Sequence, residues 1–375
     1  MPDVATNLQR VHPDRSHPER TVVARFEICY RRYLDADGNT ADGLPPLARD
    51  ADRLRALYRA MTLTRLFDKR AVAMQRIGQI GTYASSLGQE AVPVGVAAAM
   101  AQNDVLLPTY RDQGAMLWRG VTPAQLLLSW GGDERGNQHW GPAEDFPPAI
   151  PIASQAPHAV GVATAIKLRG EHRAAVCMLG DGATSKGDFY EALNLAGVWS
   201  LPVLFVVTNN QWAISLPRAS QSAAETLAQK AIAGGVPAEQ VDGNDVLAVH
   251  QAATEALERA RSGLGASLIE ALTYRLSDHT TADDASRYRS TEEVSAHWPA
   301  EPLTRLRAYL GRLGWWSKAD EEALLKDCER IVEEGRAAYL AMPADHPTAM
   351  FDHLFATLPR SLAVQRRRFE ENGHG

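Results

Sequence analysis

Apolar residues recur at helical spacing near the start of the main fold. From Leu47 to Leu87, and most clearly in LRALYRAMTLTRLFDKRAVAM, they fall three and four positions apart, which predicts a long amphipathic helix. A second helix is expected over residues 89–100. The preceding residues are mostly polar and end in the turn-rich stretch DADGNTADGLPP. We therefore expect an N-terminal extension over residues 1–45, whose apolar patch VVARFEICYRRYL can dock on another surface.

Further along the chain, apolar strands alternate with helical patterns. Five prolines between residues 142 and 157 exclude a continuous helix and indicate an ordered loop. The later pattern predicts helices over residues 158–169, 188–199 and 245–262, and strands AAVCML (174–179), PVLFVVT (202–208) and SLIEALTY (267–274). Such βαβ units build an α/β fold, a parallel sheet flanked by helices, with ligands beyond the carboxyl ends of the strands.

The same pattern divides the chain into three parts. Residues 46–300 are expected to form the α/β domain, between the extension and a charged, helical C-terminal region over residues 301–375. Any chemistry should lie in the α/β domain, because its loops follow the strands.

Composition and charge exclude several classes of protein. The 375 residues can bury a full core, and the net charge of −6 is spread along the chain, which gives no basis for nucleic-acid binding. Cys29, Cys177 and Cys328 are far apart, which argues against a zinc site or a disulfide scaffold. The first residues lack a signal-peptide pattern, and the apolar stretch at residues 91–101 is too short to span a membrane. We expect a cytoplasmic protein.

Two polar residues follow strands of the expected sheet. Asp181 comes directly after the strand AAVCML and its glycine, and Asn210 comes just after the strand PVLFVVT. If these strands are neighbours, both side chains lie at one edge of the sheet and can reach one ion. A carboxylate and an amide oxygen suit Mg²⁺, which takes its other ligands from phosphate and water.

The residues after Asp181 add to this site. Gly182 and Ala183 allow backbone N–H groups to approach a phosphate, and the N-terminal end of the following helix adds positive potential. A GDG sequence alone is more often an ordinary turn. Together with Asn210, it favours a diphosphate with its metal.

Several longer segments point to one family. Residues 180–210 read GDGATSKGDFYEALNLAGVWSLPVLFVVTNN. The others are TYASSLGQEA (82–91), LPTYRDQGAMLWRG (107–120), NNQWAIS (209–215), VDGNDVLAV (241–249) and TYRLSDHTTADDASRYRS (273–290). In this order they resemble the alpha subunits of the thiamine-diphosphate-dependent first, decarboxylating component of 2-oxo acid dehydrogenase complexes. The resemblance covers most of residues 50–320 and implies a thiamine-diphosphate-binding, transketolase-like fold.

The resemblance also implies roles for individual residues. Asp181, Asn210 and the backbone carbonyl of Trp212 would coordinate Mg²⁺. The cofactor would be held by Tyr110, Arg111, Ile152, Gly180, Asp181, Gly182, Ala183, Asn210, Trp212, Ala213 and His279. Arg111 offers a planar, charged fork for phosphate oxygens, and Ile152 matches the aliphatic residue that supports the bent cofactor. His279 matches the catalytic histidine of the family, and a histidine titrates near neutral pH.

Partners follow from the same resemblance. Thiamine diphosphate supplies carbanion chemistry, while the protein supplies orientation and electrostatics. The family's activating glutamate belongs to a separate beta chain, so we expect an alpha2-beta2 heterotetramer that is inactive without that chain. Such an oxidoreductase decarboxylates a 2-oxo acid and acylates the lipoyl group of a dihydrolipoamide acyltransferase.

The substrate is less determined than the family. The segments GNQ, FPP and LAQKAIAGGVP resemble bacterial pyruvate dehydrogenases, whereas VDGNDV and HTTADDASRYRS also occur in branched-chain 2-oxo acid dehydrogenases. Pyruvate is slightly favoured, and acetoin is a third choice. Thr82, Thr208 and Asp278 depart from common family patterns and bear on this preference.

Two other classes remain as alternatives. A non-catalytic nucleotide- or phosphate-binding protein can use the same crevice, although the sequence has neither GxGxxG nor GxxxxGK[ST]. A hydrolase would place Asp181, Asp188, Asp283 and Asp284 around a metal. Asp188 weakens this reading because it begins a predicted helix.

Overall fold

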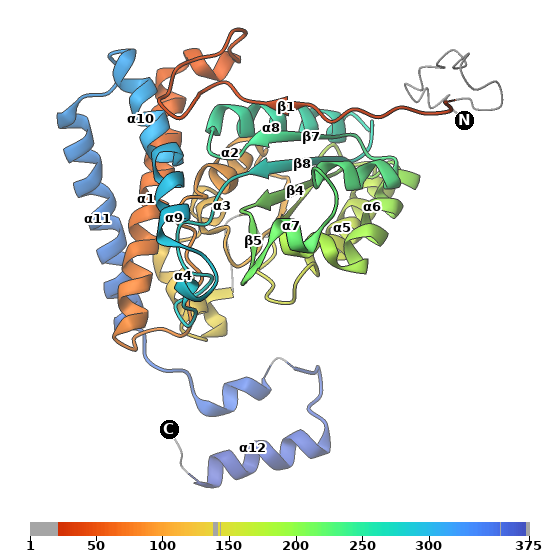
Figure 1. The fold of residues 1–375 in the computed structure, drawn as a ribbon. Coiled ribbons are helices and arrows are strands. Elements are labelled where there is room, and N and C mark those ends of the chain that lie inside the picture. The colour runs from red at the N-terminus through yellow and green to blue at the C-terminus, as the bar shows by residue number, and fades with distance from the viewer. Residues whose placement is uncertain (1–21, 138–141, 143, 353, 373–375) are drawn as a thin grey trace.

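A parallel sheet forms the centre of the part of the chain that the structure describes, residues 22–372 without 138–141, 143 and 353. In this computed structural model the strands follow the order β1-β7-β8-β4-β3-β2 (Figure 1). The sheet consists of β1 Tyr30–Arg31, β2 Val105–Leu107, β3 Ala175–Gly180, β4 Val203–Asn209, β7 Ala238–Asp242 and β8 Ser267–Leu272, and a separate hairpin consists of β5 Trp212–Ala213 and β6 Leu216–Pro217. The expected α/β fold is therefore confirmed.

Helices cover both faces of this sheet (Figure 1). The α-helices are α1 Ala51–Arg76, α2 Ala91–Ala99, α3 Gln113–Trp118, α4 Pro123–Trp130, α5 Gln155–Arg169, α6 Gly187–Val198, α7 Arg218–Gln221, α8 Val246–Arg261, α9 Thr291–His297, α10 Pro302–Arg312, α11 Lys318–Ala341 and α12 Arg360–Asn372. The 3-10 helices are η1 Pro46–Arg49, η2 Glu134–Asn137, η3 Asp181–Ser185, η4 Ala228–Gly234, η5 Ala285–Arg287, η6 Trp298–Ala300 and η7 Pro347–Phe351. None of the described helices combines the length and apolar character that a bilayer crossing requires.

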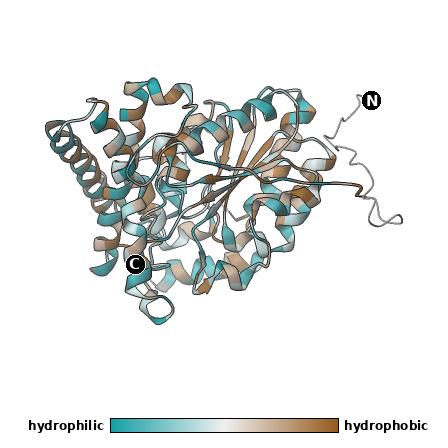
Figure 2. Cartoon of the chain, turned by 45° about the horizontal axis from the view of Figure 1, so that its top comes forward, coloured by the Kyte–Doolittle hydropathy of each residue, from teal (hydrophilic) through white to brown (hydrophobic). Residues whose placement is uncertain are grey.

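Alternate residues of each central strand enter two different cores. In β3, Val176 and Met178 pack with α2 and α8 on one face, whereas Cys177 packs with α5 and α6 on the other. This alternation follows from the two-residue period of a strand, and it explains why the central strands are apolar throughout. In Figure 2 the strands are coloured mostly as hydrophobic, while the outward-facing turns of the surrounding helices are hydrophilic.

The long helix α1 joins this domain to an outer helical layer. Its apolar stripe packs against α10 and α11, which lie beside it in Figure 1. Asp50 caps α1 by accepting the backbone N–H of Arg53 at 3.1 Å, and Ser317 caps α11 with a capping box. The helix expected within residues 47–87 is thus present but shorter: it begins at Ala51, after the 3-10 helix η1, and ends at Arg76.

The register places the carboxyl ends of the central strands side by side. Gly180 pairs with Thr208 across β3 and β4, and Asn209 pairs with Leu272 across β4 and β8. The strands before Asp181 and Asn210 are therefore direct neighbours, which is the condition for both side chains to reach one ion. Residues that follow these strands enter the same crevice.

Three details differ from the sequence expectation. The helix expected over 158–169 begins earlier, at Gln155, because Pro157 occupies its first turn, where a missing N–H breaks no helical hydrogen bond. The short strands β2 and β7 were not foreseen. The patch VVARFEICYRRYL supplies β1, which pairs with β7 and leaves Leu34 only 1% exposed, so it docks on the chain's own sheet.

Candidate active site

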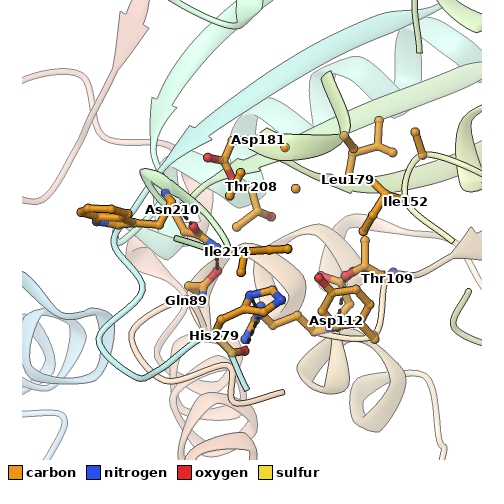
Figure 3. Close-up of a pocket in the computed structure, with 18 of the residues that line it drawn as sticks. Gln89, Thr109, Asp112, Ile152, Leu179, Asp181, Thr208, Asn210, Ile214 and His279 are labelled. Atoms are coloured by element: carbon orange, nitrogen blue, oxygen red, sulfur yellow. Dashed lines mark hydrogen bonds between the residues drawn. The ribbon is translucent and has the colours of Figure 1, made fainter. Parts of the chain in front are cut away.

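A cavity of about 330 Å³ opens at the carboxyl ends of β2, β3, β4 and β8 (Figure 3). It is large enough for a cofactor-sized ligand. All eleven residues expected at the cofactor line it: Tyr110, Arg111, Ile152, Gly180, Asp181, Gly182, Ala183, Asn210, Trp212, Ala213 and His279. The structure thus brings together residues from five separate segments, and their individual roles stay predictions.

Asp181 is a buried carboxylate with one oxygen atom that lacks a hydrogen-bond partner. Its side chain is 2% exposed, and its Oδ2 atom has no hydrogen-bond partner among the described residues. Burial raises the pKa of Asp181 to about 6, although backbone N–H groups and the positive charges of Arg275 and Arg111 act in the opposite direction. A buried carboxylate with a free oxygen is a strong candidate to bind a cation.

The two asparagines after β4 point to different partners. Asn209 donates to Glu270 Oε1 at 2.6 Å, whereas Asn210 donates from Nδ2 to Gln89 Oε1 at 2.9 Å. The Oδ1 atom of Asn210 accepts the backbone N–H of Trp212 at 3.2 Å. Of the pair, only Asn210 lines the cavity.

The backbone around the cavity adopts left-handed conformations at residues other than glycine. Ala153, Gln211 and Ile214 have φ of 67°, 72° and 58°. An isoleucine in this region is an outlier, and such strain is typical of functional sites. The Gln211 turn aims the Trp212 carbonyl at Arg275, whose Nη1 lies 3.4 Å away.

The GDG turn presents its backbone closely to the cavity. A Cβ at Gly182 would lie 3.0 Å from Ala213 Cβ, a tight contact, so glycine favours the close approach of the two loops. The first residues of this turn form η3, and α6 starts only at Gly187. The N–H groups beside Asp181 therefore belong to η3, and the helix expected from residue 188 begins at Gly187, after this turn. Lys230 Nζ donates to Thr184 Oγ1 at 2.9 Å, which holds the turn in place.

Arg111 and His279 close the cavity from two other segments. Arg111 Nη2 lies 3.0 Å from the carbonyl oxygen of His279 and 3.2 Å from its Nδ1. The Tyr110 ring stands edge-on to the imidazole, with centroids 6.4 Å apart. Asp112 holds this loop by accepting the N–H and hydroxyl of Thr109 at 2.7 and 2.6 Å.

His279 is neutral in this environment. Burial, together with the charges of Arg111 and Arg275, lowers its pKa to about 4, while Asp283 acts in the opposite direction. Its Nδ1 faces two guanidinium groups, at 3.2 Å from Arg111 and 3.4 Å from Arg275. Because arginine only donates, Nδ1 must accept, and the ring proton resides on Nε2.

Comparison with known proteins agrees with this geometry. Residues 58–347 match the sequence model of the family described as dehydrogenase E1 component. The chain belongs to this family. It is 42% identical over 333 residues to the 3-methyl-2-oxobutanoate dehydrogenase subunit alpha of Mycobacterium tuberculosis, covering 87% of this chain and 91% of the relative. It is 40% identical over 316 residues to the pyruvate dehydrogenase E1 component subunit alpha of Bacillus subtilis, covering 84% and 85%.

Family membership confirms the resemblance stated from the sequence. As an E1 component, the chain is the alpha subunit of a thiamine-diphosphate-dependent 2-oxo acid dehydrogenase, an oxidoreductase. A non-catalytic phosphate-binding protein is thereby set aside. The four-aspartate hydrolase is also set aside, because the described residues contain no group of three or more His, Cys, Asp or Glu side chains able to hold a metal.

The residues of this E1 chain fit thiamine diphosphate. The unpaired oxygen of Asp181 calls for a cation, and a single carboxylate leaves room for phosphate oxygens in the coordination shell. Gly180 and Gly182 line the cavity without side chains. Thr208, one of the departures from the family pattern, also lines the cavity, and its buried hydroxyl has no partner among the described residues.

Three residues of this site were missed by sequence reasoning. Gln89, Asp112 and Arg275 lie inside the segments that carried the resemblance, yet nothing in the sequence singled them out. Arg275 is fully buried and donates to the Ile214 carbonyl at 2.8 Å and the Tyr288 hydroxyl at 2.9 Å. Buried arginines are rare, so burial marks Arg275 as a functional candidate. The sequence alone does not show this burial.

Proposed function

We propose that this E1 alpha chain holds Mg²⁺ through Asp181, Asn210 and the Trp212 carbonyl, and the diphosphate through Tyr110, Arg111 and the backbone at Gly182 and Ala183. The observation that carries the proposal is the buried, unpaired Oδ2 of Asp181 in the cavity that Asn210 also lines. Arg275 donates to the Trp212 carbonyl, and a second lone pair of that oxygen remains for a metal.

His279 is proposed as the catalytic residue of this chain. Its neutral imidazole offers the Nε2 proton as a donor to an anionic substrate, and Arg111 holds the ring in place. Ile152 is proposed to support the cofactor, because it lines the cavity and 46% of it stays exposed. When bound, thiamine diphosphate supplies the carbanion chemistry that removes CO₂ from a 2-oxo acid.

The site is proposed to be completed by a beta chain. Ile150, Ile152, Ile214 and Leu216 lie at or beside the cavity and are 63%, 46%, 57% and 44% exposed. An exposed apolar rim is typical of a protein interface. The relatives are named alpha subunits, which implies a partner. We propose an alpha2-beta2 heterotetramer that passes the acyl group to the lipoyl group of a dihydrolipoamide acyltransferase.

The substrate is proposed to be a short 2-oxo acid. Sequence segments slightly favoured pyruvate, and the pyruvate dehydrogenase subunit of B. subtilis is 40% identical. The 42% identity to the M. tuberculosis subunit favours 3-methyl-2-oxobutanoate as the second candidate. Comparing kcat/KM of the alpha-beta complex for the two acids decides: a tenfold preference for the branched acid would overturn the pyruvate proposal.

Two further expectations belong with this proposal. Residues 46–300 would form the diphosphate-binding half, with residues 1–45 and 301–375 as flanking parts. A cytoplasmic location is proposed because Cys29, Cys177 and Cys328 are free thiols, as a reducing compartment would keep them.

The central test is Asp181→Asn in the assembled alpha-beta complex. Equilibrium binding of thiamine diphosphate should require Mg²⁺ in the parent and be lost, by about a hundredfold or more, in the variant, since a charged ligand of the metal is removed. Asp188→Asn is the matched control, because Asp188 is half-exposed on α6, pairs with Lys186 and does not line the cavity. Normal Mg²⁺-dependent binding by Asp181→Asn would overturn the proposal.

A further inference from the structure

Gln89 is a buried glutamine of the cavity to which no role has been given. It lies just before α2 and is 2% exposed. Its Oε1 accepts the Nδ2 hydrogen of Asn210 at 2.9 Å, a contact between residues 121 positions apart (Figure 3). In the described part of the chain its own Nε2 has no hydrogen-bond partner.

The backbone N–H of Trp212 fixes the direction of both amides. An N–H only donates, so the atom of Asn210 that faces it at 3.2 Å must be Oδ1. This orientation leaves Nδ2 of Asn210 for Gln89, which must then present Oε1. The Trp212 N–H thus orients the amide of Asn210, and the Nδ2 group of Asn210 in turn orients the amide of Gln89. An arrangement with both amides flipped is therefore excluded.

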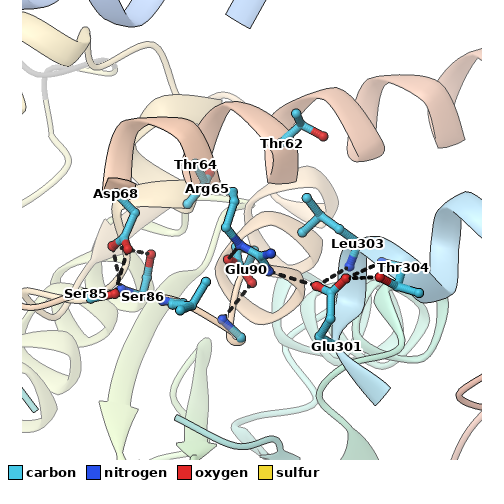
Figure 4. Close-up of polar contacts among 12 residues, drawn as sticks. Thr62, Thr64, Arg65, Asp68, Ser85, Ser86, Glu90, Glu301, Leu303 and Thr304 are labelled. Carbon is cyan, nitrogen blue, oxygen red and sulfur yellow. Dashed lines mark hydrogen bonds and ion pairs between the residues drawn. The ribbon is translucent and has the colours of Figure 1, made fainter. Parts of the chain in front are cut away.

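The surrounding loop holds Gln89 rigidly at this place. Asp68 accepts the hydroxyl of Ser85 at 2.6 Å and the N–H of Ser86 at 2.7 Å, and the buried Glu90 pairs with Arg65 (Figure 4). The N–H of Gln89 itself donates to the carbonyl of Ser86 at 2.9 Å. The position of Oε1 is therefore set before any ligand arrives.

Gly88, in the same loop, occupies a position where any side chain would clash with its neighbours. Its φ is +88°, and a Cβ there would lie 2.8 Å from Leu276 Cγ and from the Tyr274 carbonyl oxygen. Its carbonyl accepts the Thr273 hydroxyl at 2.9 Å, which ties the loop to the end of β8. The loop that carries Gln89 is thus fastened to the strand end that leads to His279.

We propose that Gln89 is a positioning residue that keeps the Oδ1 of Asn210 turned toward the metal. If the amide of Asn210 rotated, its NH₂ group would face the cation and repel it. Gln89 prevents this rotation by accepting Nδ2, and it does not itself bind the metal. The unpaired Nε2 group of Gln89 is unfavourable because it is buried. An apolar side chain of the same size would avoid this cost, so the presence of glutamine indicates a need for its side-chain carbonyl oxygen. The inference rests on the proposed function.

The test compares Gln89→Leu with Gln89→Glu in the assembled alpha-beta complex. Thiamine diphosphate binding is measured at equilibrium while Mg²⁺ is varied. Gln89→Leu should raise the Mg²⁺ concentration for half-saturation about tenfold or more, as is usual when a residue that orients a metal ligand is lost. Binding should recover at saturating Mg²⁺ with unchanged stoichiometry, which a misfolded site would not do. Gln89→Glu keeps an oxygen acceptor and should stay within about threefold of the parent.

Gln75→Leu serves as the control, because Gln75 belongs to α1 and does not line the cavity. An unchanged Mg²⁺ dependence in Gln89→Leu, or a defect of equal size in Gln89→Glu, would overturn the inference. If Asp181→Asn is inactive in binding while Gln89→Leu is normal, only this inference fails. If Asp181→Asn binds normally, the proposed function fails and the inference with it.

Discussion

The guanidinium group of Arg111 lies against the imidazole of His279, 3.2 Å from Nδ1 and 3.0 Å from the backbone carbonyl oxygen. The contact positions the ring and also places a positive charge beside it. Burial is the main reason that His279 is neutral, and the charge of Arg111 acts in the same direction. The pair therefore controls the state in which His279 meets a substrate.

Removing this charge should make His279 more basic. In Arg111→Met the pKa of His279 is expected to rise from about 4 toward the ordinary value near 6.5, because one of two neighbouring cations is lost. NMR titration of the histidine ring checks this. Arg287→Met, at an exposed position on η5 of the same loop region, should leave the pKa unchanged. An unshifted pKa of His279 in Arg111→Met would contradict the proposed cause.

Asp181 should destabilise the protein when metal and cofactor are absent. Burial raises its pKa from 3.8 to about 6 in the folded state. The carboxyl therefore does not oppose folding below pH 3.8, where it is protonated in the folded and the unfolded protein. Its destabilising effect grows above this pH and is complete once the pH has risen through 6. At pH 8 the metal-free Asp181→Asn complex should be more stable to unfolding by about 1–3 kcal/mol, since one pKa unit corresponds to about 1.4 kcal/mol. Urea unfolding at pH 4 and pH 8 measures the difference, which should be small at pH 4. A parent more stable than Asp181→Asn at pH 8 without Mg²⁺ would be the opposite result.

Arg275 should be irreplaceable by lysine. Its guanidinium joins the Ile214 carbonyl, the Tyr288 hydroxyl and the Trp212 carbonyl, and one ammonium group cannot reach all three. Arg275→Lys should lower the stability by about 2–4 kcal/mol because buried acceptors lose their donors. Limited proteolysis should then cleave between residues 211 and 217 faster than in the parent. Cleavage at the parental rate would show that the loop is held by other contacts.

Ile214 should matter for assembly more than for folding. It is 57% exposed at φ +58°, a conformation that asparagine tolerates better than a β-branched residue. Ile214→Asn should leave the thermal stability of the chain equal or slightly higher, yet weaken association with the beta chain about tenfold by removing an apolar contact. Sedimentation of the mixed subunits measures this. Leu168→Asn, at a residue 82% exposed on α5 beyond the opposite end of the strands, is the control. Equal effects of both variants would remove the argument for an interface at the cavity.

Much of the fold was accessible from the sequence, because it depends on local patterns. The apolar strands before Asp181 and Asn210 were recognisable by their composition, and their parallel pairing follows from the helix between them. The proline-rich pattern predicts a loop up to Pro157, yet α5 begins at Gln155, because the first turn of a helix accepts proline. Strand β2 has only three residues, and β7 (AEQVD) has three polar residues among its five, so neither gives a clear apolar pattern.

The sequence by itself determined the family, the parallel sheet, and the placement of Asp181 and Asn210 after two of its strands. Only the tertiary structure decided how these side chains are oriented and charged. The Gln89 contact with Asn210 joins residues 121 positions apart, and the neutral state of His279 depends on burial and on Arg111, 168 positions away. Burial and hydrogen-bond direction arise from distant segments packed together, so they leave no local pattern in the chain.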